Sequence, residues 1–302
     1  MTIRHSALGL ILVGVVLSGC SIKAAYNNFD RFAKWQVSDY VDFDERQEAY
    51  FDAELARLLY WHRTTELPRY VQWLETVAKA TTEERTEETL PEVVKEVIAA
   101  AELVETRAMP MTIELMLSLS DGQLALLPDK LARDNEEFME EEAGLSEAEA
   151  REAWFESMEG ASKRFLGRLS AQQRQYLQTQ SLRYQPEQRL WVEYRARWQA
   201  ELLKALANRR DVQSFVQSYE RLVADRELYY GTEFASVSKS NEDLRRDVTL
   251  GLLRTADDKQ RERLIETMQD IAEDLRELAA EAAPSAPPSG GCLVRCPEAA
   301  LL

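Results

Sequence analysis

Apolar side chains recur at helical spacing along most of the chain, and this periodicity limits the folds open to it. No stretch alternates with a period of two for long enough to require a β-sheet. Similar apolar stripes begin at Phe51, Tyr70, Val93, Trp154 and Val212. The pattern predicts an all-α, multi-helix, bundle-like domain. Its clearest run lies near the C-terminus and consists of Leu264, Ile265, Met268, Ile271, Ala272, Leu275, Leu278 and Ala279.

Prolines and glycines mark the expected interruptions of these helices. Pro68 separates the first two stripes, and Pro110 is expected to kink or end the helix that carries the third. Residues 231–240 combine Gly with several Ser residues and are expected to form a substantial internal loop.

The C-terminal residues differ in composition from the body. Residues 283–302 are rich in Pro, Ser and Gly and are expected to form a disordered tail, which leaves residues 20–282 as the helical domain. This domain forms one body or two packed subdomains. The tail holds Cys292 and Cys296, which either form a small disulfide loop in an oxidising compartment or remain thiols without a role.

Several expected helix starts share one short motif. Each has Ser or Asp at the N-cap, Gln or Glu three residues later, and a large apolar residue before the cap. This spacing forms a capping box, in which each of the two side chains accepts a backbone N–H of the other residue. The boxes are Phe43-Asp44-x-x-Gln47, Leu119-Ser120-x-x-Gln123, Leu145-Ser146-x-x-Glu149 and Leu169-Ser170-x-x-Gln173.

The charge balance is strongly acidic and unevenly distributed. The formal net charge of the 302 residues is −16. Residues 133–160 carry 11 acidic and 2 basic side chains, whereas residues 174–221 carry 9 basic and 5 acidic ones. A net negative surface repels the phosphates of nucleic acid, so we expect no nucleic-acid partner.

The basic segment admits two interpretations. In the first, its arginines pair with nearby carboxylates and its aromatic residues pack in the core. In the second, the same residues form a surface for an anionic envelope ligand, because arginine stacks on aromatic rings and binds carboxylates. The residues concerned are Arg183, Tyr184, Arg189, Trp191, Tyr194, Arg195, Arg197 and Trp198.

The sequence offers little for catalysis. His5 falls in the expected signal peptide, which leaves His62 as the one histidine of the mature chain. His62 lies on an apolar stripe, where a hydrogen-bonded structural histidine is expected, and no Gly-x-Ser-x-Gly motif accompanies it. The pair Glu156-Ser157 superficially resembles that of lytic transglycosylases, but the Gly-Leu-Met-Gln-like segment expected after it is missing.

No metal or cofactor is expected. Zinc sites usually need several His or Cys ligands, which the body lacks, and there is no Gly-rich phosphate loop. One acidic cluster could weakly bind Ca²⁺ or Mg²⁺, although roles at helix ends explain it better. Its members are Asp39, Asp42, Asp44 and Glu45.

The first residues have the layout of a signal peptide. Arg4 is followed by an apolar run from Leu8 to Leu17, which is too short to span a bilayer. The segment Leu17-Ser18-Gly19-Cys20 resembles the lipobox of bacterial lipoproteins. The resemblance implies cleavage after residue 19 and acylation of Cys20, and Ser21 implies sorting to the outer membrane, facing the periplasm.

A second motif follows the cysteine. It consists of Tyr26-Asn27-Asn28, Trp35, Asp39-Tyr40-Val41-Asp42 and Gln47, and it resembles the opening of an uncharacterised family of Gram-negative helical lipoproteins with a domain of unknown function. The resemblance implies a candidate interaction element made of Tyr26, Asn27, Asn28, Trp35, Asp39 and Tyr40. Because the segment contains no Gly or Pro, we expect a docked helix over residues 29–40, with Trp35 buried.

Together these features predict a non-catalytic outer-membrane lipoprotein that binds or scaffolds an envelope partner, such as a protein or peptidoglycan. One alternative is a periplasmic chaperone or stress-related protein, because the Leu-Ser-x-x-Gln boxes resemble the Leu-Thr-x-x-Gln signature of the Spy/CpxP family. Here Ser or Asp replaces Thr, and the chain is much longer. A peptidoglycan-active enzyme is the least favoured alternative.

Overall fold

The computed structural model describes residues 22–141, 144–282 and 285–294. In these ranges the chain forms helices and no strand, which confirms the all-α fold. The expected signal peptide, Cys20, Ser21 and Cys296 lie outside the described residues. The first helices are α2 (Ile22–Asn27), α3 (Phe29–Ser38), α4 (Glu45–Trp61), the π-helical turn η1 (His62–Glu66), α5 (Leu67–Thr82), α6 (Thr86–Ser118) and α7 (Asp121–Glu141).

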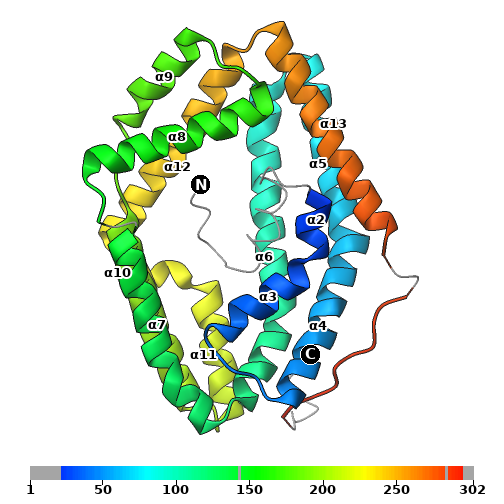
Figure 1. Cartoon of the computed structure of the whole chain (residues 1–302), viewed down its shortest axis with the longest axis vertical. Coiled ribbons are helices and arrows are strands. Elements are labelled where there is room, and N and C mark those ends of the chain that lie inside the picture. The colour runs from blue at the N-terminus through cyan, green and yellow to red at the C-terminus, as the bar shows by residue number, and fades with distance from the viewer. Residues whose placement is uncertain (1–21, 142–143, 283–284, 295–302) are drawn as a thin grey trace.

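The later helices complete a ring-shaped arrangement (Figure 1). On one side of the ring α13 packs along α5, beside α4 and α6; α7, α10 and α11 form the other side, and α8, α9 and α12 close one end. These elements are α8 (Glu147–Leu166), α9 (Ala171–Ser181), α10 (Gln188–Ala207), α11 (Val212–Ala224), the 3₁₀ turn η2 (Arg226–Tyr229), α12 (Gly231–Arg254) and α13 (Asp258–Ala280).

Separate apolar clusters hold the ring together. The largest joins α2–α6 with α13 and includes Phe51, Leu67 and Leu275. A second cluster joins α8, α9, α12 and α13, and a third joins α6, α7, α10 and α11. Each junction therefore buries its own apolar surface. Within the described ranges, every helix lacks either the length or the apolar character that a membrane span requires.

Of the two outcomes expected at Pro110, an end of the helix is wrong, because α6 continues to Ser118. Pro110 cannot donate to the carbonyl of Thr106, yet both residues lie on the exposed face of α6, where water can satisfy that oxygen. The opposite face buries Val104 and Ala108, so packing against α6 is not interrupted.

The expected loop at residues 231–240 is also wrong, since these residues begin α12. Gly231 has a φ of +73°, a left-handed conformation that ends the preceding turn. Arg197 of α10 fixes this turn by donating to the carbonyl oxygens of Tyr229 and Tyr230, at 2.9 and 2.8 Å. Phe234 is then buried, and the polar residues that suggested a loop lie on the outer side of the helix.

The predicted capping boxes are confirmed, and two of them interlock with each other. Gln47 of α4 and Gln123 of α7 exchange hydrogen bonds, since each Nε2 donates to the Oε1 of the other, at 3.3 and 2.7 Å. Gln47 also donates to the Ser118 carbonyl oxygen at 3.0 Å, and Gln123 to that of Asp42 at 2.7 Å. Each Oε1 accepts its own N-cap N–H as well, so both amides are satisfied. We call this pair the Gln47–Gln123 clasp.

The second pair repeats this arrangement bond for bond. Gln173 of α9 and Gln260 of α13 exchange two hydrogen bonds of 2.9 Å. Gln173 also donates to the Thr255 carbonyl oxygen at 3.2 Å, and Gln260 donates to that of Arg168 at 3.0 Å. Each of these carbonyl groups lies two residues before the N-cap of the other glutamine's box. We call this the Gln173–Gln260 clasp. The box that supplies Gln260 begins at Asp257, and the sequence analysis missed it.

The remaining box differs at the residue three positions after its cap. Glu149 accepts hydrogen bonds from the backbone N–H and the hydroxyl of Ser146 at the exposed start of α8. An ionised carboxylate has no hydrogen to donate, so Glu149 could not take the place of a glutamine in a clasp. Glutamine at this position thus accompanies a clasp, and glutamate accompanies a solitary cap.

The described part of the C-terminal tail, residues 285–294, contains no helix or strand and lies against α4 and α6. Glu54 accepts from the Ser289 hydroxyl at 2.7 Å and the Gly290 N–H at 2.8 Å. Glu114, which is almost fully buried, accepts from the Val294 N–H at 2.6 Å. Cys292 lies beside Glu114, with 2.7 Å between its Sγ and the Glu114 Oε1. Its expected partner Cys296 lies outside the described residues.

Candidate functional site

The N-terminal segment is docked on the ring, as the sequence predicts, and its strongest polar contact lies inside the core. Tyr26 and His62 share a hydrogen bond of 2.8 Å between Oη and Nδ1. Both side chains are almost fully buried. His62 begins η1, the π-helical turn between α4 and α5, and such turns often occur at functional sites. We therefore treat the Tyr26–His62 cluster as the candidate site.

Burial determines the protonation state of the cluster. It lowers the pKa of His62 to about 3, and the neighbouring Arg63 adds to this effect, so the imidazole is neutral at physiological pH. Burial raises the pKa of Tyr26 and of Tyr70, whose ring packs edge-on against His62 at 5.4 Å between centroids. Among the described residues, His62 Nε2 and Tyr70 Oη have no hydrogen-bond partner. A neutral group without solvent contact is suited to a structural role, as expected for His62.

Asn27 joins the cluster to the end of α13. Its Oδ1 accepts from Arg63 at 2.6 Å, and its Nδ2 donates to Glu281 at 3.2 Å. Arg63 also donates to the Leu278 carbonyl oxygen at 3.2 Å and lies 4.9 Å above the Tyr26 ring. Asn28 instead bonds within its own helical segment, to the Ala24 carbonyl oxygen at 2.7 Å. Of the two asparagine side chains, only that of Asn27 contacts the helical body outside the N-terminal segment.

Tyr40 connects the same segment to the other side of the ring. Its hydroxyl donates to Asp134 of α7 and accepts from Arg195 of α10 at 3.3 Å. Burial and the bond to Asp134 raise the pKa of Tyr40 to about 12, so the phenol stays protonated. Asp39 caps the C-terminal end of α3 through its backbone N–H. The motif from Tyr26 to Tyr40 therefore bridges both sides of the ring.

The expectation that Trp35 is buried is wrong, since 58% of its surface is exposed. The inward face of the segment is set by Phe29 and Ala33, which are 1% and 3% exposed. At 100° per residue, Trp35 lies about 200° from Ala33 around the helix axis and so points away from the body. Phe32 lies on the same outer side, 39% exposed, with its ring 5.8 Å from that of Trp35.

The basic segment matches the first of its two interpretations at most positions. Arg195 contacts Asp134 and Tyr40, and Arg197 donates to the Tyr229 carbonyl oxygen in the turn before α12. Arg189 pairs with Glu193 at 3.6 Å. The aromatic residues of α10 are at least half-buried; the Trp198 indole N–H donates to the Leu222 carbonyl oxygen at 2.9 Å. These bonds leave little of the segment for an external ligand.

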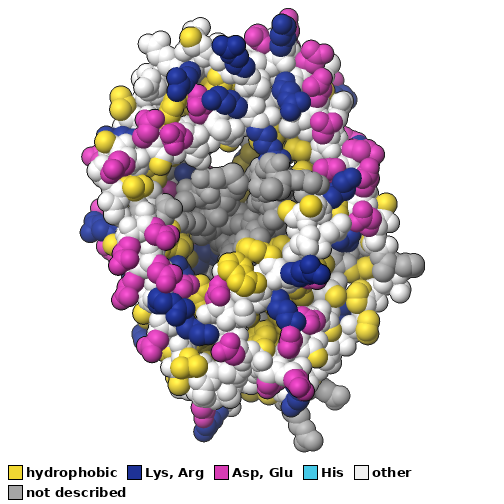
Figure 2. All heavy atoms as spheres, in the orientation of Figure 1, with side chains coloured by type: hydrophobic (Ala, Val, Ile, Leu, Met, Phe, Trp, Pro, Cys, Tyr) yellow, Lys and Arg dark blue, Asp and Glu magenta, His cyan; other side chains and the backbone are white. Residues whose placement is uncertain are grey.

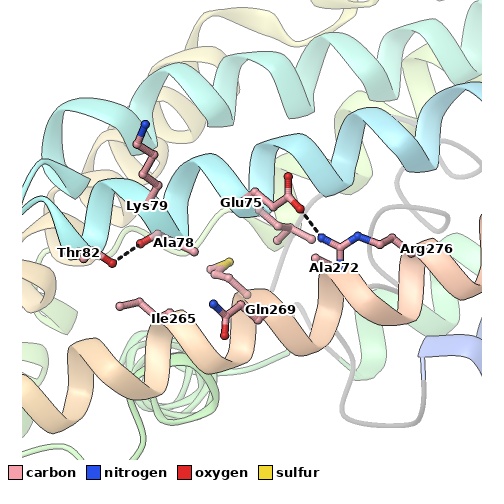
Figure 3. A pocket seen from close by; sticks show the side chains of 10 residues that line it. Glu75, Ala78, Lys79, Thr82, Ile265, Gln269, Ala272 and Arg276 are labelled. Carbon is pink, nitrogen blue, oxygen red and sulfur yellow. Dashed lines mark hydrogen bonds and ion pairs between the residues drawn. The ribbon is translucent and has the colours of Figure 1, made fainter.

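A groove of about 320 Å³ lies between α5 and α13 (Figure 3). Its charged groups bind one another: Glu75 and Arg276 form an ion pair across it, and Lys79 lies 3.9 Å from Glu83. Figure 3 shows the apolar side chains of Ala78, on α5, and of Ile265 and Ala272, on α13, among those that line the groove. The groove therefore presents an apolar floor and a paired rim.

In the acidic cluster at residues 39–45, Asp44 and Glu45 have the helix-terminal roles that the sequence favours, whereas the Asp42 carboxylate lies in the loop before α4, 3.9 Å from the Lys130 Nζ. Asp44 is the N-cap of α4 and accepts from the backbone N–H groups of Arg46 and Gln47. In the described part of the chain, no group of three or more His, Cys, Asp or Glu side chains could hold a metal ion. The sequence could place His62 on an apolar stripe, but its partner lies 36 residues away and carries no local signal.

The fold and the site define a class of protein: an all-α ring with an N-terminal segment docked on it through a buried tyrosine–histidine pair. The chain belongs to DUF6279, described as a family of unknown function, whose model matches residues 39–235. The matched range includes Asp39 and Tyr40 and begins after Trp35. No curated protein and no solved structure matches the chain.

Proposed function

We propose that this protein is a lipid-anchored component of the bacterial outer membrane whose helical body binds or scaffolds an envelope partner on the periplasmic side. One observation carries the proposal: the lipobox-like Leu17-Ser18-Gly19-Cys20 ends only two residues before α2, which is packed into the body. The acyl chains on Cys20 would then hold the whole ring at the membrane surface, since two or more chains anchor a protein stably.

Binding fits the body better than catalysis does. The buried His62 is neutral and closed to solvent, and the buried Glu66, Glu114 and Glu187 each face a cation or a backbone N–H. General acid–base catalysis needs a titratable group within reach of the substrate. Release of soluble fragments from purified peptidoglycan, abolished by a single Glu→Gln change, would favour the enzyme alternative instead.

Acylation is tested by growing cells with radiolabelled palmitate and comparing the wild type with Cys20→Ala. We expect label in the wild type and none in the variant; equal labelling would overturn the anchor. Membrane fractionation on a sucrose gradient then tests the sorting, and recovery of the wild type with the inner membrane would contradict the role given to Ser21.

The chaperone alternative is tested on the same full-length protein. The clasps give the glutamines of the boxes a structural task, so the boxes by themselves are explained without a client protein. A chaperone would suppress the aggregation of an unfolded client at stoichiometric amounts. Leu126→Ser and Leu182→Ser each remove an exposed apolar side chain. If these variants suppress client aggregation as well as the wild type does, the client binds to another surface.

A further inference from the structure

The exposed side of the N-terminal segment carries an aromatic stripe that the fold does not use. The exposed residues of α2 and α3 recur at helical spacing. Phe32 and Trp35 are the only exposed Phe and Trp side chains among the described residues. Figure 2 shows hydrophobic side chains at the surface near the position of α3 in Figure 1. We call the following residues the α3 stripe: Ala24, Asn28, Arg31, Phe32 and Trp35.

The segment is fixed in this orientation. Tyr26, Phe29 and Ala33 anchor its inner face in the largest apolar cluster. Lys23 pairs with Asp274 of α13 at 3.6 Å, and Lys34 pairs with Asp52 of α4 at 3.1 Å. Because both helices are held by packing and by these ion pairs, the stripe cannot turn inward. Its aromatic rings stay exposed to whatever lies outside the body.

The position of the stripe in the chain places it close to the proposed anchor. Cys20 precedes Ile22 by two residues, so their Cα atoms lie at most about 7 Å apart. Trp35 follows Ile22 by thirteen residues, which is about 20 Å along a helical path. Acyl chains in a bilayer would therefore keep the whole stripe within about 30 Å of the lipid headgroups.

The local charge also differs from that of the rest of the chain. Residues 22–38 contain Lys23, Arg31 and Lys34 against Asp30, a net of 3 − 1 = +2, whereas the chain as a whole carries −16. The two lysines neutralise carboxylates of the body. Arg31 is exposed and forms no ion pair with any described carboxylate. An arginine beside exposed Trp and Phe rings suits the headgroup region of a bilayer.

We propose that the α3 stripe docks on the surface of the lipid bilayer, with the rings of Phe32 and Trp35 among the headgroups and Arg31 at the lipid phosphates. The inference rests on the proposed acylation of Cys20 and adds to it a second, protein-made contact. It sets the orientation of the ring on the membrane, which a flexible lipid tether alone would leave free.

Quenching of tryptophan fluorescence by brominated lipids tests the contact. The full-length acylated protein is reconstituted in vesicles of phosphatidylethanolamine and phosphatidylglycerol at a 3:1 ratio, with and without lipids brominated near the headgroup. We expect brominated lipid to quench the wild type. Trp35→Phe should lose most of this quenching, and Trp73→Phe, which alters a half-buried residue of α5, should keep it.

Equal quenching of the wild type and Trp35→Phe would overturn the proposal. Quenching of Trp35 fluorescence by iodide gives a second test. If protection from iodide depends on protein concentration and not on lipid, the stripe contacts a second copy of the chain and the proposal is overturned. Mass spectrometry of the same preparation reports acylation of Cys20 separately. A chain without acyl groups would reject the anchor, whereas an acylated chain with an unquenched Trp35 would reject the α3 stripe alone.

Discussion

The two glutamine clasps make the same hydrogen bonds in different surroundings. They lie at opposite ends of the ring: the Gln47–Gln123 clasp joins the starts of α4 and α7, and the Gln173–Gln260 clasp joins those of α9 and α13 (Figure 1). Gln173 and Gln260 are both buried, whereas Gln123 is half-buried and its bonds lie nearer to water. Since the cost of an unmade hydrogen bond rises with burial, identical geometry should carry different energies.

The largest effect is expected for Gln173→Glu. The carboxylate loses both donors and places a buried negative charge beside the Gln260 Oε1 and the Thr255 carbonyl oxygen. Leaving a buried charge without an opposite charge beside it typically costs about 3–5 kcal/mol of folding free energy. Urea unfolding at pH 7 measures the loss, with Gln175→Glu on the exposed face of the same helix as control. A loss no larger than that of the control would show that the clasp does not hold α9 to α13.

The next effect is a pH dependence of the free energy of unfolding, which the Tyr26–His62 cluster should produce and the clasps should not. The pKa of His62 is lowered from 6.5 to about 3 by burial, so neutral His62 contributes its full stability above pH 6.5. That contribution is lost as the pH falls from 6.5 toward 3. The free energy of unfolding should therefore fall by about 2–3 kcal/mol more in the wild type than in His62→Gln between pH 7 and 4.

Urea unfolding at pH 7, 5 and 4 gives these free energies for each variant. Glutamine does not titrate, so removing a clasp with Gln173→Leu should lower stability at every pH and leave the wild-type pH dependence unchanged. Parallel pH curves for the wild type and His62→Gln would mean that His62 is hydrated in the folded protein.

A smaller effect is expected for Gln123→Glu, the same change in the more open clasp. The new carboxylate can recruit water, so we expect a loss of about 1–2 kcal/mol, below that of Gln173→Glu. The two losses should add in the double variant, because the clasps share no residue. If Gln123→Glu costs as much as Gln173→Glu, burial does not set the strength of a clasp.

The smallest effects are expected at the solitary box of α8. Ser146→Ala removes the N-cap oxygen and should cost about 1 kcal/mol. Glu149→Gln keeps the acceptor for the Ser146 N–H and should leave the thermal midpoint nearly unchanged. Thermal unfolding followed by circular dichroism compares the two variants. A large loss in Glu149→Gln would reveal a contact of this box beyond its own helix start.

The errors at Pro110, at residues 231–240 and at Trp35 concern tertiary environment, whereas the capping box from Asp257 to Gln260 was a local signal that the predictions left out. Helical periodicity and capping boxes depend on neighbouring residues, and these predictions are confirmed. The predicted helix end at Pro110 and the predicted burial of Trp35 are wrong, because each depends on which side of a helix faces the body. A second signal was also present in the sequence but unused: Gln in a box accompanies a clasp, and Glu accompanies a solitary cap.

The sequence by itself determined the all-α class, the four helix starts with predicted capping boxes and the lipobox-like motif that suggests an anchor at Cys20, because each follows from residues close together in the chain. Only the tertiary structure decided which boxes interlock, that Tyr26 meets His62, and that Trp35 faces outward. The physical reason is that these outcomes depend on the relative rotation and placement of whole helices. The two glutamines of a clasp are 76 residues apart in one case and 87 in the other, so they meet only when their helices pack together.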